Sequence, residues 1–114
     1  AWGFQQFPAH ELWHRSLAPL GAGIRTDIGD APVYVTYDID SLDPAYAPGT
    51  GTPEIGGLTT PQAMELLRAF KGLNIVGADL VEVSPPYDTS GNTALTGANI
   101  LFEILSVLPG VAYR

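Results

Sequence analysis

The apolar side chains along this chain alternate between the spacing of a helix and that of a strand. Residues 9–28 have apolar side chains at helical spacing, so we expect one helix there, bent near Pro19 and Gly21. Residues 33–38 are β-branched and aromatic instead, which predicts a buried strand that begins after a turn at residues 29–32. The apolar positions of the helix are Leu12, Trp13, Leu17, Leu20 and Ile24.

The second half of the chain repeats the order of helix and strand. Thr59 is followed by Pro61 and Gln62, which is the pattern of a capped helix start. This helix is expected to run to Lys71, because Gly72 can adopt the left-handed conformation that ends a helix.

A nearly continuous apolar run follows at residues 73–83, which is typical of a strand buried on both faces. Asn92 or Thr93 can then cap a last helix that ends near Leu108.

This alternation predicts an α/β domain with a parallel sheet and right-handed crossovers. Two parallel strands are too few for an independent sheet, so we expect further strands from sequence outside these 114 residues or from neighbouring subunits. In open α/β sheets ligands bind beyond the carboxyl ends of the strands, where Asp38, Asp40 and Glu82 would gather.

Asp38 and Asp40 are the first candidate functional residues. Because side chains alternate along a strand, both carboxylates would point to one face and Ile39 to the other. Two neighbouring carboxylates resist joint ionisation unless a cation lies between them, so a metal ion is their simplest partner. The proline- and glycine-rich loop that follows is long but stiff, as ordered functional loops are. Without that loop, the Asp-x-Asp pattern would indicate two solvated aspartates.

Residues 33–58, in which Asp-Ile-Asp precedes Pro-Gly-Thr-Gly-Thr-Pro, resemble the signature of the ureohydrolases, the arginase and agmatinase family of binuclear manganese amidinohydrolases. The resemblance implies an arginase-like three-layer α/β/α fold with a parallel sheet. It also implies that Asp38 and Asp40 bind two Mn²⁺ ions together with histidines and aspartates of earlier motifs. A metal-held hydroxide would then attack the guanidinium carbon of a linear guanidino compound, with release of urea and an amine.

Residues 81–85, Val-Glu-Val-Ser-Pro, also resemble this family. The resemblance implies that Glu82 is the catalytic and substrate-binding carboxylate, which pairs with the substrate guanidinium and orients it. For a lone glutamate in an apolar strand, an internal salt bridge is the alternative. Asp79 lies three residues before Glu82 and would face the opposite side of the strand, where its role would be to support the loop after the strand or the structure around it.

Residues 84–95 and 107–111 look most like the agmatinase and guanidino-acid hydrolase branch. We therefore expect residues 1–114 to be the carboxyl-terminal portion of one ureohydrolase domain that acts on agmatine or on a guanidino acid such as 4-guanidinobutyrate. The family's Gly-Gly-Asp-His and Asp-Ala-His-x-Asp motifs do not occur in these residues. A non-catalytic fragment or assembly piece of such an enzyme is the alternative.

Composition and charge exclude some classes of partner and indicate a cellular compartment. The net charge is −7 and the five Lys and Arg residues are scattered, so nucleic acid is not expected as a partner. No apolar run has the length of a bilayer crossing, and no membrane partner is expected. The absence of cysteine fits a reducing compartment, so we expect a cytoplasmic enzyme. The family resemblance adds a small-molecule guanidino substrate and a homo-oligomer.

His10, Glu11 and His14 match the His-Glu-x-x-His pattern of zinc peptidases, in which two histidines one helical turn apart bind zinc. A zinc peptidase is therefore a minor alternative, although catalysis also needs a third protein ligand and the chain has no further histidine. The other interpretation is a solvated helix face with Trp13 packed inward.

Overall fold

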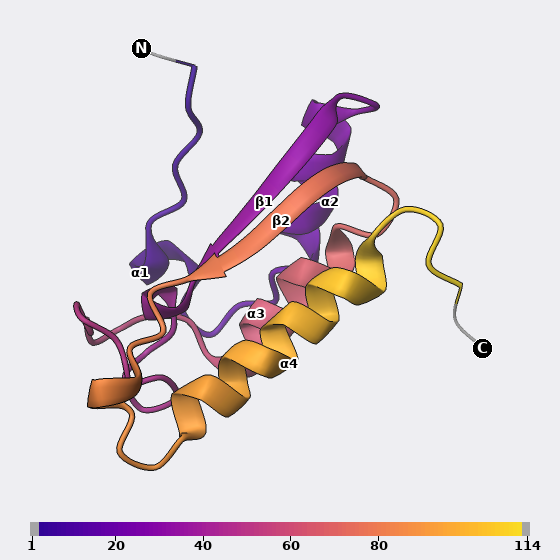
Figure 1. Cartoon of the computed structure of the whole chain (residues 1–114). Helices are drawn as coiled ribbons and strands as arrows, with labels where there is room; N and C mark the ends of the chain where they lie inside the picture. The colour runs from indigo at the N-terminus through magenta and orange to yellow at the C-terminus, as the bar shows by residue number, and fades with distance from the viewer. Residues whose placement is uncertain (1–2, 113–114) are drawn as a thin grey trace.

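A computed structural model of the chain describes residues 3–112 and contains a two-stranded parallel sheet with helices packed against it. Strands β1 and β2 pair from Pro32 with Asn74 to Asp38 with Val81 (Figure 1). The pairing confirms the predicted α/β class with a parallel sheet. In chain order the elements are α1 (Ala9–Leu12), α2 (Ala18–Ile28), β1 (Pro32–Asp38), the 3-10 helix η1 (Ile39–Ser41), α3 (Thr60–Ala69), β2 (Asn74–Val81), the 3-10 helix η2 (Pro85–Tyr87) and α4 (Asn92–Val107).

The start of α3 follows the predicted chemistry. The Thr59 hydroxyl accepts a hydrogen bond from the Gln62 backbone N–H, and the Gln62 side chain accepts one from the Thr59 backbone N–H. This capping box satisfies two N–H groups that have no partner within the helix. After the helix, Gly72 adopts a φ of 96°, so the predicted left-handed glycine is confirmed.

The single helix expected over residues 9–28 is two helices. Helix α1 ends at Leu12, and His14 adopts a φ of 54°, which no continuous helix allows. Pro19 then lies in the first turn of α2, where a proline lacks no hydrogen bond that the helix would have made. Helical spacing continued across the break, which is why the pattern did not reveal it.

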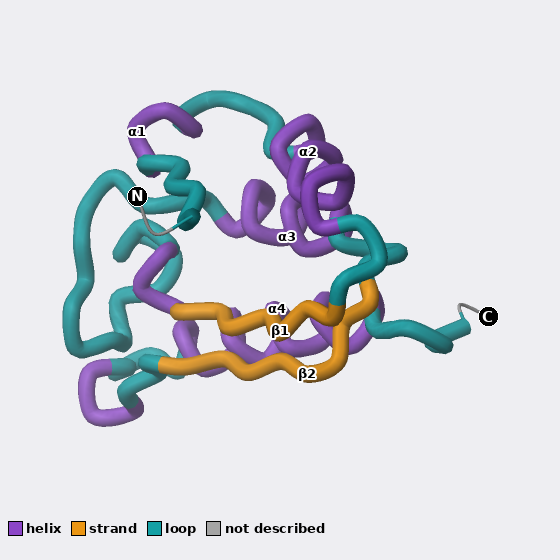
Figure 2. The backbone as a smooth tube through the Cα atoms, turned by 90° about the horizontal axis from the view of Figure 1, so that it is seen from above, coloured by secondary structure: helices purple, strands orange, loops and turns teal. Residues whose placement is uncertain are grey.

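Helix α4 packs against β2 on one face of the sheet, α3 packs against α4, and α2 packs against α3 (Figures 1 and 2). The core between sheet and helices is closed by Ile39, Ile100 and Leu67, which are at most 2% exposed. The other face of the sheet has no helix among residues 3–112. Tyr34 is accordingly 61% exposed and Val76 65% exposed, so the prediction that residues 73–83 are buried on both faces is wrong for this part of the fold.

The cap of α4 also differs from the expectation. The residue before the helix is Gly91, with a φ of 75°, and neither Asn92 nor Thr93 caps the helix with its own side chain. The Asp88 carboxylate instead accepts hydrogen bonds from the backbone N–H groups of Thr93 at 3.1 Å and Ala94 at 2.8 Å. No helix in the described part of the chain is long and apolar enough to cross a membrane.

Candidate functional site at the carboxyl ends of the strands

The loops that follow β1 and β2 lie side by side at one end of the sheet (Figures 1 and 2). The backbone N–H of Ser84, after β2, donates a 2.8 Å hydrogen bond to the carbonyl of Gly49, in the loop after β1. The parallel direction of the strands brings both loops to the same edge. Polar side chains from either loop can therefore act on one ligand.

Asp38 is the last residue of β1, and Asp40 lies two residues later in the 3-10 helix η1. The prediction that strand alternation aligns the two carboxylates is wrong in its reason, because the strand has ended before Asp40. The turn of η1 brings them together instead: the Asp40 backbone N–H donates to the Asp38 carboxylate at 3.2 Å. Ile39 points into the core and is fully buried, as predicted.

The carboxyl group of Asp38 lies among other negative charges. Partial burial raises its pKa above the ordinary value, and the nearby carboxylates of Asp40 and Glu82 raise it further, although the hydrogen bond from the Asp40 N–H opposes them. Asp38 and Asp40 thus lie together at the end of β1, and Glu82 directly follows Val81, the strand partner of Asp38. Such a cluster becomes stable in its fully ionised form when a cation or a cationic ligand joins it.

Thr52 is a member of this site that the sequence reasoning did not single out. Its hydroxyl donates a 2.7 Å hydrogen bond to the second oxygen of Asp40. The contact fixes the orientation of that carboxylate from the Pro48–Gly57 loop. The only sign of this role in the sequence is that Thr52 carries a hydroxyl and lies in the stiff loop after the acidic pair. Because Thr52 and Asp40 are twelve residues apart, no local pattern predicts their contact.

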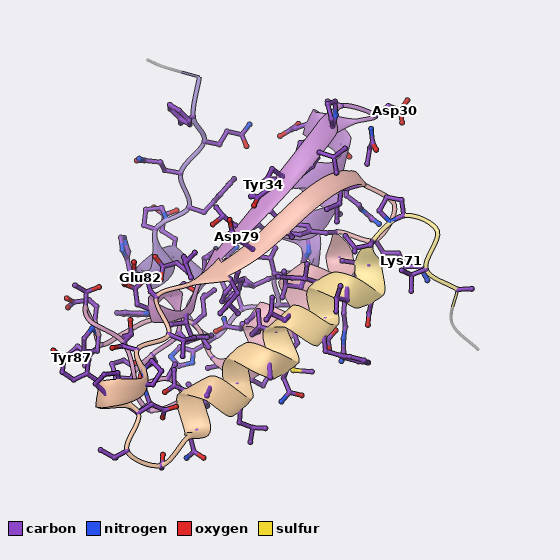
Figure 3. The ribbon with its side chains drawn as sticks, viewed as in Figure 1. Asp30, Tyr34, Lys71, Asp79, Glu82 and Tyr87 are labelled. Carbon is purple, nitrogen blue, oxygen red and sulfur yellow. The ribbon has the colours of Figure 1, made fainter. Side chains whose placement is uncertain are left out.

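Glu82 lies just beyond the end of β2, which stops at Val81 (Figure 3). Its side chain is exposed, and its φ of 68° lies in the left-handed region that non-glycine residues rarely adopt. The expected position inside an apolar strand is therefore wrong, and so is the reason given for an internal salt bridge. The unusual backbone lies directly after Val81, which pairs with Asp38 across the two strands, so Glu82 begins its loop beside the end of β1.

Asp79 lies on the open face of the sheet beside Tyr34 (Figure 3). It accepts hydrogen bonds from the hydroxyls of Thr36 at 2.6 Å and Tyr34 at 2.8 Å. Since these partners belong to β1, the expectation that Asp79 supports the loop is wrong. It links the two strands, and because alternation along β1 places Thr36 and Asp38 on one face, Asp79 shares the face of Asp38.

The histidine pair does not have the geometry of a zinc site. His10 is in α1, but His14 follows the end of that helix, so the two residues do not face one another across a helical turn. Trp13 is half exposed rather than packed inward, and its indole N–H donates a 2.8 Å hydrogen bond to the Gly56 carbonyl. This segment therefore holds the loop after β1 and shows no sign of binding zinc.

The donor atoms at the strand ends fit part of a manganese site. Carboxylate oxygens are hard ligands that suit Mn²⁺, and the turn of η1 places those of Asp38 and Asp40 close together. Within residues 3–112, however, no group of three or more His, Cys, Asp or Glu side chains is arranged to hold a metal ion. Asp38 and Asp40 could therefore supply at most part of the ligand set of such a site.

Comparison with known proteins gives a consistent result. The model of the arginase family matches residues 1–106. The chain is 63% identical over 112 residues to a guanidinobutyrase of Pseudomonas aeruginosa, with coverage of 98% of this chain and 35% of that protein. It is 67% identical over 109 residues to a mitochondrial agmatinase of Gallus gallus, covering 96% of this chain and 32% of the relative. The chain thus spans about a third of the length of these curated relatives.

Solved structures agree with the fold. The proclavaminate amidino hydrolase of Streptomyces clavuligerus superposes with a TM-score of 0.85 at 43% identity, over 90% of this chain and 34% of that one. An arginase of Bacillus subtilis superposes with a TM-score of 0.83 at 25% identity, over 98% and 39% of the two chains. The predicted arginase-like fold is confirmed, and the chain accounts for part of it.

Proposed function

The chain belongs to the arginase family, and from this premise we propose that its residues form part of a manganese-dependent hydrolase of linear guanidino compounds. We propose further that residues 1–114 are the carboxyl-terminal portion of one ureohydrolase domain, and we call the longer protein that contains them the complete enzyme. One observation carries the proposal: in a chain of this family, Asp38, Asp40 and Glu82 follow one another at the carboxyl ends of two paired parallel strands, where Asp38 lies opposite Val81. Their roles follow from the chemistry of guanidino hydrolysis.

Asp38 and Asp40 would hold manganese, with Thr52 fixing the direction of one Asp40 oxygen. When bound, the metal supplies a water of lowered pKa as the nucleophile, which a guanidinium needs because its delocalised charge makes it a poor electrophile. Glu82 would pair with the substrate guanidinium through a charge-assisted hydrogen bond and turn its carbon toward the aspartates. The acidic character of the site attracts a cationic substrate before any reaction begins.

The candidate substrates are agmatine and guanidino acids such as 4-guanidinobutyrate. Relatives of both kinds match the chain at similar identity, 63% for the guanidinobutyrase and 67% for the agmatinase. The two substrates share the guanidinium end and differ at the tail, where one bears an amine and the other a carboxylate. Glu82 and the aspartates act on the shared end, so selection of the tail belongs to other parts of the complete enzyme.

A non-catalytic role is the second candidate for the 114 residues on their own. It is favoured by the ligand set, because the described residues supply two carboxylates and no third metal ligand. Such a piece would serve in assembly, and we propose a homo-oligomeric complete enzyme in the cytoplasm. Reading the gene upstream for Gly-Gly-Asp-His and Asp-Ala-His-x-Asp separates the two candidates, since those motifs carry the remaining ligands in the family.

The test of function is urea release from agmatine and from 4-guanidinobutyrate, with manganese added, by the complete enzyme and by the 114-residue chain. We expect urea from the complete enzyme with one of the two substrates, and none from the short chain. If the complete enzyme binds manganese and releases no urea from either substrate, the proposed substrate class is wrong.

A further inference from the structure

Glu82 and the Asp38–Asp40 pair must keep a fixed separation for the proposed reaction, yet they belong to different loops. Glu82 follows β2, whereas Asp40 lies in η1 after β1. Glu82 also has a φ of 68°, a conformation that persists only where surrounding contacts hold it. The contacts that join the two loops therefore decide the geometry of the site.

Gly49 joins the loop after β1 to the loop after β2 through its carbonyl, and to helix α4 through its N–H. Its carbonyl accepts a 2.8 Å hydrogen bond from the N–H of Ser84, two residues after Glu82. Its N–H donates a 2.8 Å hydrogen bond to the side-chain oxygen of Thr93, in the first turn of α4. The approach is close: a Cβ on Gly49 would lie 2.5 Å from the Cβ of Asp88.

The same loop reaches the metal end of the site. Thr52, three residues after Gly49, donates to the Asp40 carboxylate. A short path of hydrogen bonds and backbone thus runs from Asp40 through Gly49 and Ser84 to Glu82. Thr93 is the point at which helix α4 anchors this path.

Thr93 is suited to the task because it is fully buried and its hydroxyl is committed on two sides. The hydroxyl accepts the Gly49 N–H, and it also helps the N–H groups of Ala94 and Thr93 to hold the pKa of Asp88 below its ordinary value. A side chain of equal size without the hydroxyl would leave the Gly49 N–H buried and unpaired, which is costly.

We propose that Thr93 is a positioning residue for guanidino hydrolysis, which fixes Glu82 relative to Asp38 and Asp40 through the hydrogen bonds of Gly49. The proposal rests on the proposed function. Thr93 acts at a distance, since its side chain is fully buried and its hydroxyl accepts the Gly49 N–H.

The first test compares three variants of the complete enzyme in manganese-supported urea release. Thr93→Val should lower kcat/KM about 10-fold, because a displacement of 1 Å at a reacting group costs up to ~100-fold. Thr93→Ser keeps the hydroxyl and should restore most of the rate. Thr96→Val is the matched control, since Thr96 lies one turn later on α4 and makes no side-chain hydrogen bond in the described structure. Unchanged kcat/KM in Thr93→Val would overturn the proposal.

A double-mutant comparison separates positioning from general loss of structure. If Thr93 acts through Glu82, then Thr93→Val should cost much less when added to Glu82→Gln than when added to the native enzyme. An equal loss in both backgrounds would show that Thr93 acts on the whole fold, and the positioning role would be wrong.

Amide hydrogen exchange of the metal-free complete enzyme provides a readout that does not depend on activity. Thr93→Val should speed exchange at Gly49 and Ser84 while Thr96→Val leaves it unchanged. Equal exchange at these amides in both variants would contradict the proposed link between the loops. Faster exchange in an enzyme that releases no urea would leave the link in place and show that the proposed function is the part that failed.

Discussion

The two strands carry one carboxylate each, Asp38 on β1 and Asp79 on β2, and the two differ in what surrounds them. Asp79 accepts hydrogen bonds from Thr36 and Tyr34, and these two donors hold its pKa below the ordinary value. Asp38 is partly buried beside Asp40 and Glu82, and its pKa is raised. The Asp79 carboxylate is surrounded by hydrogen-bond donors, whereas that of Asp38 lies beside other carboxylates.

The contrast extends to the other carboxylates of residues 3–112. Those with a shifted pKa other than Asp38 have it lowered, each by hydrogen bonds from nearby donors; they are Asp43, Glu65, Asp79, Asp88 and Glu103. Acidic groups that hold the fold together are thus matched with donors. Asp38 differs from them because desolvation and two neighbouring carboxylates raise its pKa, and perturbed pKa values cluster at functional sites.

Asp40→Ala in the complete enzyme tests the contrast most severely. It removes one of the two carboxylates proposed to bind manganese, and urea release should fall by at least about 100-fold, since loss of groups that merely support metal ligands already costs 10- to 100-fold. Metal analysis of the purified variant should show a matching loss of manganese, and circular dichroism should show an unchanged fold. Full turnover by this variant would remove the basis for the site.

Glu82→Gln separates substrate binding from metal binding. The variant keeps the shape of the side chain but loses its charge, so it should retain manganese and lose the charge-assisted bond to the guanidinium. A bond of this kind contributes about 1.5–3 kcal/mol, which corresponds to roughly 10- to 150-fold in kcat/KM. Steady-state kinetics with either substrate measures the loss, and native kinetics would show that the proposed contact is wrong.

Asp38→Asn should stabilise the metal-free complete enzyme, although it removes a proposed metal ligand. The substitution relieves repulsion among three carboxylates. Because these groups are largely exposed to solvent, we expect a gain of about 1 kcal/mol or less, equivalent to ~2–4 °C at most in the thermal midpoint. Thermal unfolding with a chelator present measures it. A lower midpoint would mean that Asp38 is already matched by donors, as Asp79 is.

Asp79→Asn should lower stability, in contrast to Asp38→Asn, and the size of the loss should depend on pH. The folded-state pKa of Asp79 is lowered, so its stabilising contribution is present above the unfolded value of about 3.9 and is lost as pH falls through the folded pKa. The variant should therefore be less stable than the native protein near neutral pH, and the difference should vanish in acid. Thermal unfolding over pH 2–7 tests this. Asp30→Asn is the control, because the Asp30 side chain accepts no hydrogen bond in the described structure.

Local chemistry in the sequence was enough for the two strands and for both ends of α3, but not for the break between α1 and α2. The capping box at Thr59 and the glycine at 72 act within a few residues, so spacing alone revealed them. The bond from Thr52 to Asp40 and the left-handed backbone of Glu82 depend on contacts between loops, which no local pattern encodes. The open face of the sheet could not be foreseen either, because an apolar run predicts burial whether or not the covering chain is present.

Substitution of the two histidines should have the smallest effect on manganese content and urea release, because neither imidazole belongs to the proposed site. Removal of both imidazoles in His10→Ala/His14→Ala should leave manganese content and urea release within about twofold of the native enzyme, since surface substitutions away from special contacts rarely change stability by more than ~0.5 kcal/mol. Trp13→Phe is the informative partner variant, because it breaks the bond from the indole to Gly56 and should loosen the loop that holds Thr52. If the double histidine variant lost metal and Trp13→Phe did not alter kinetics, residues 9–14 would bind the metal rather than brace the loop.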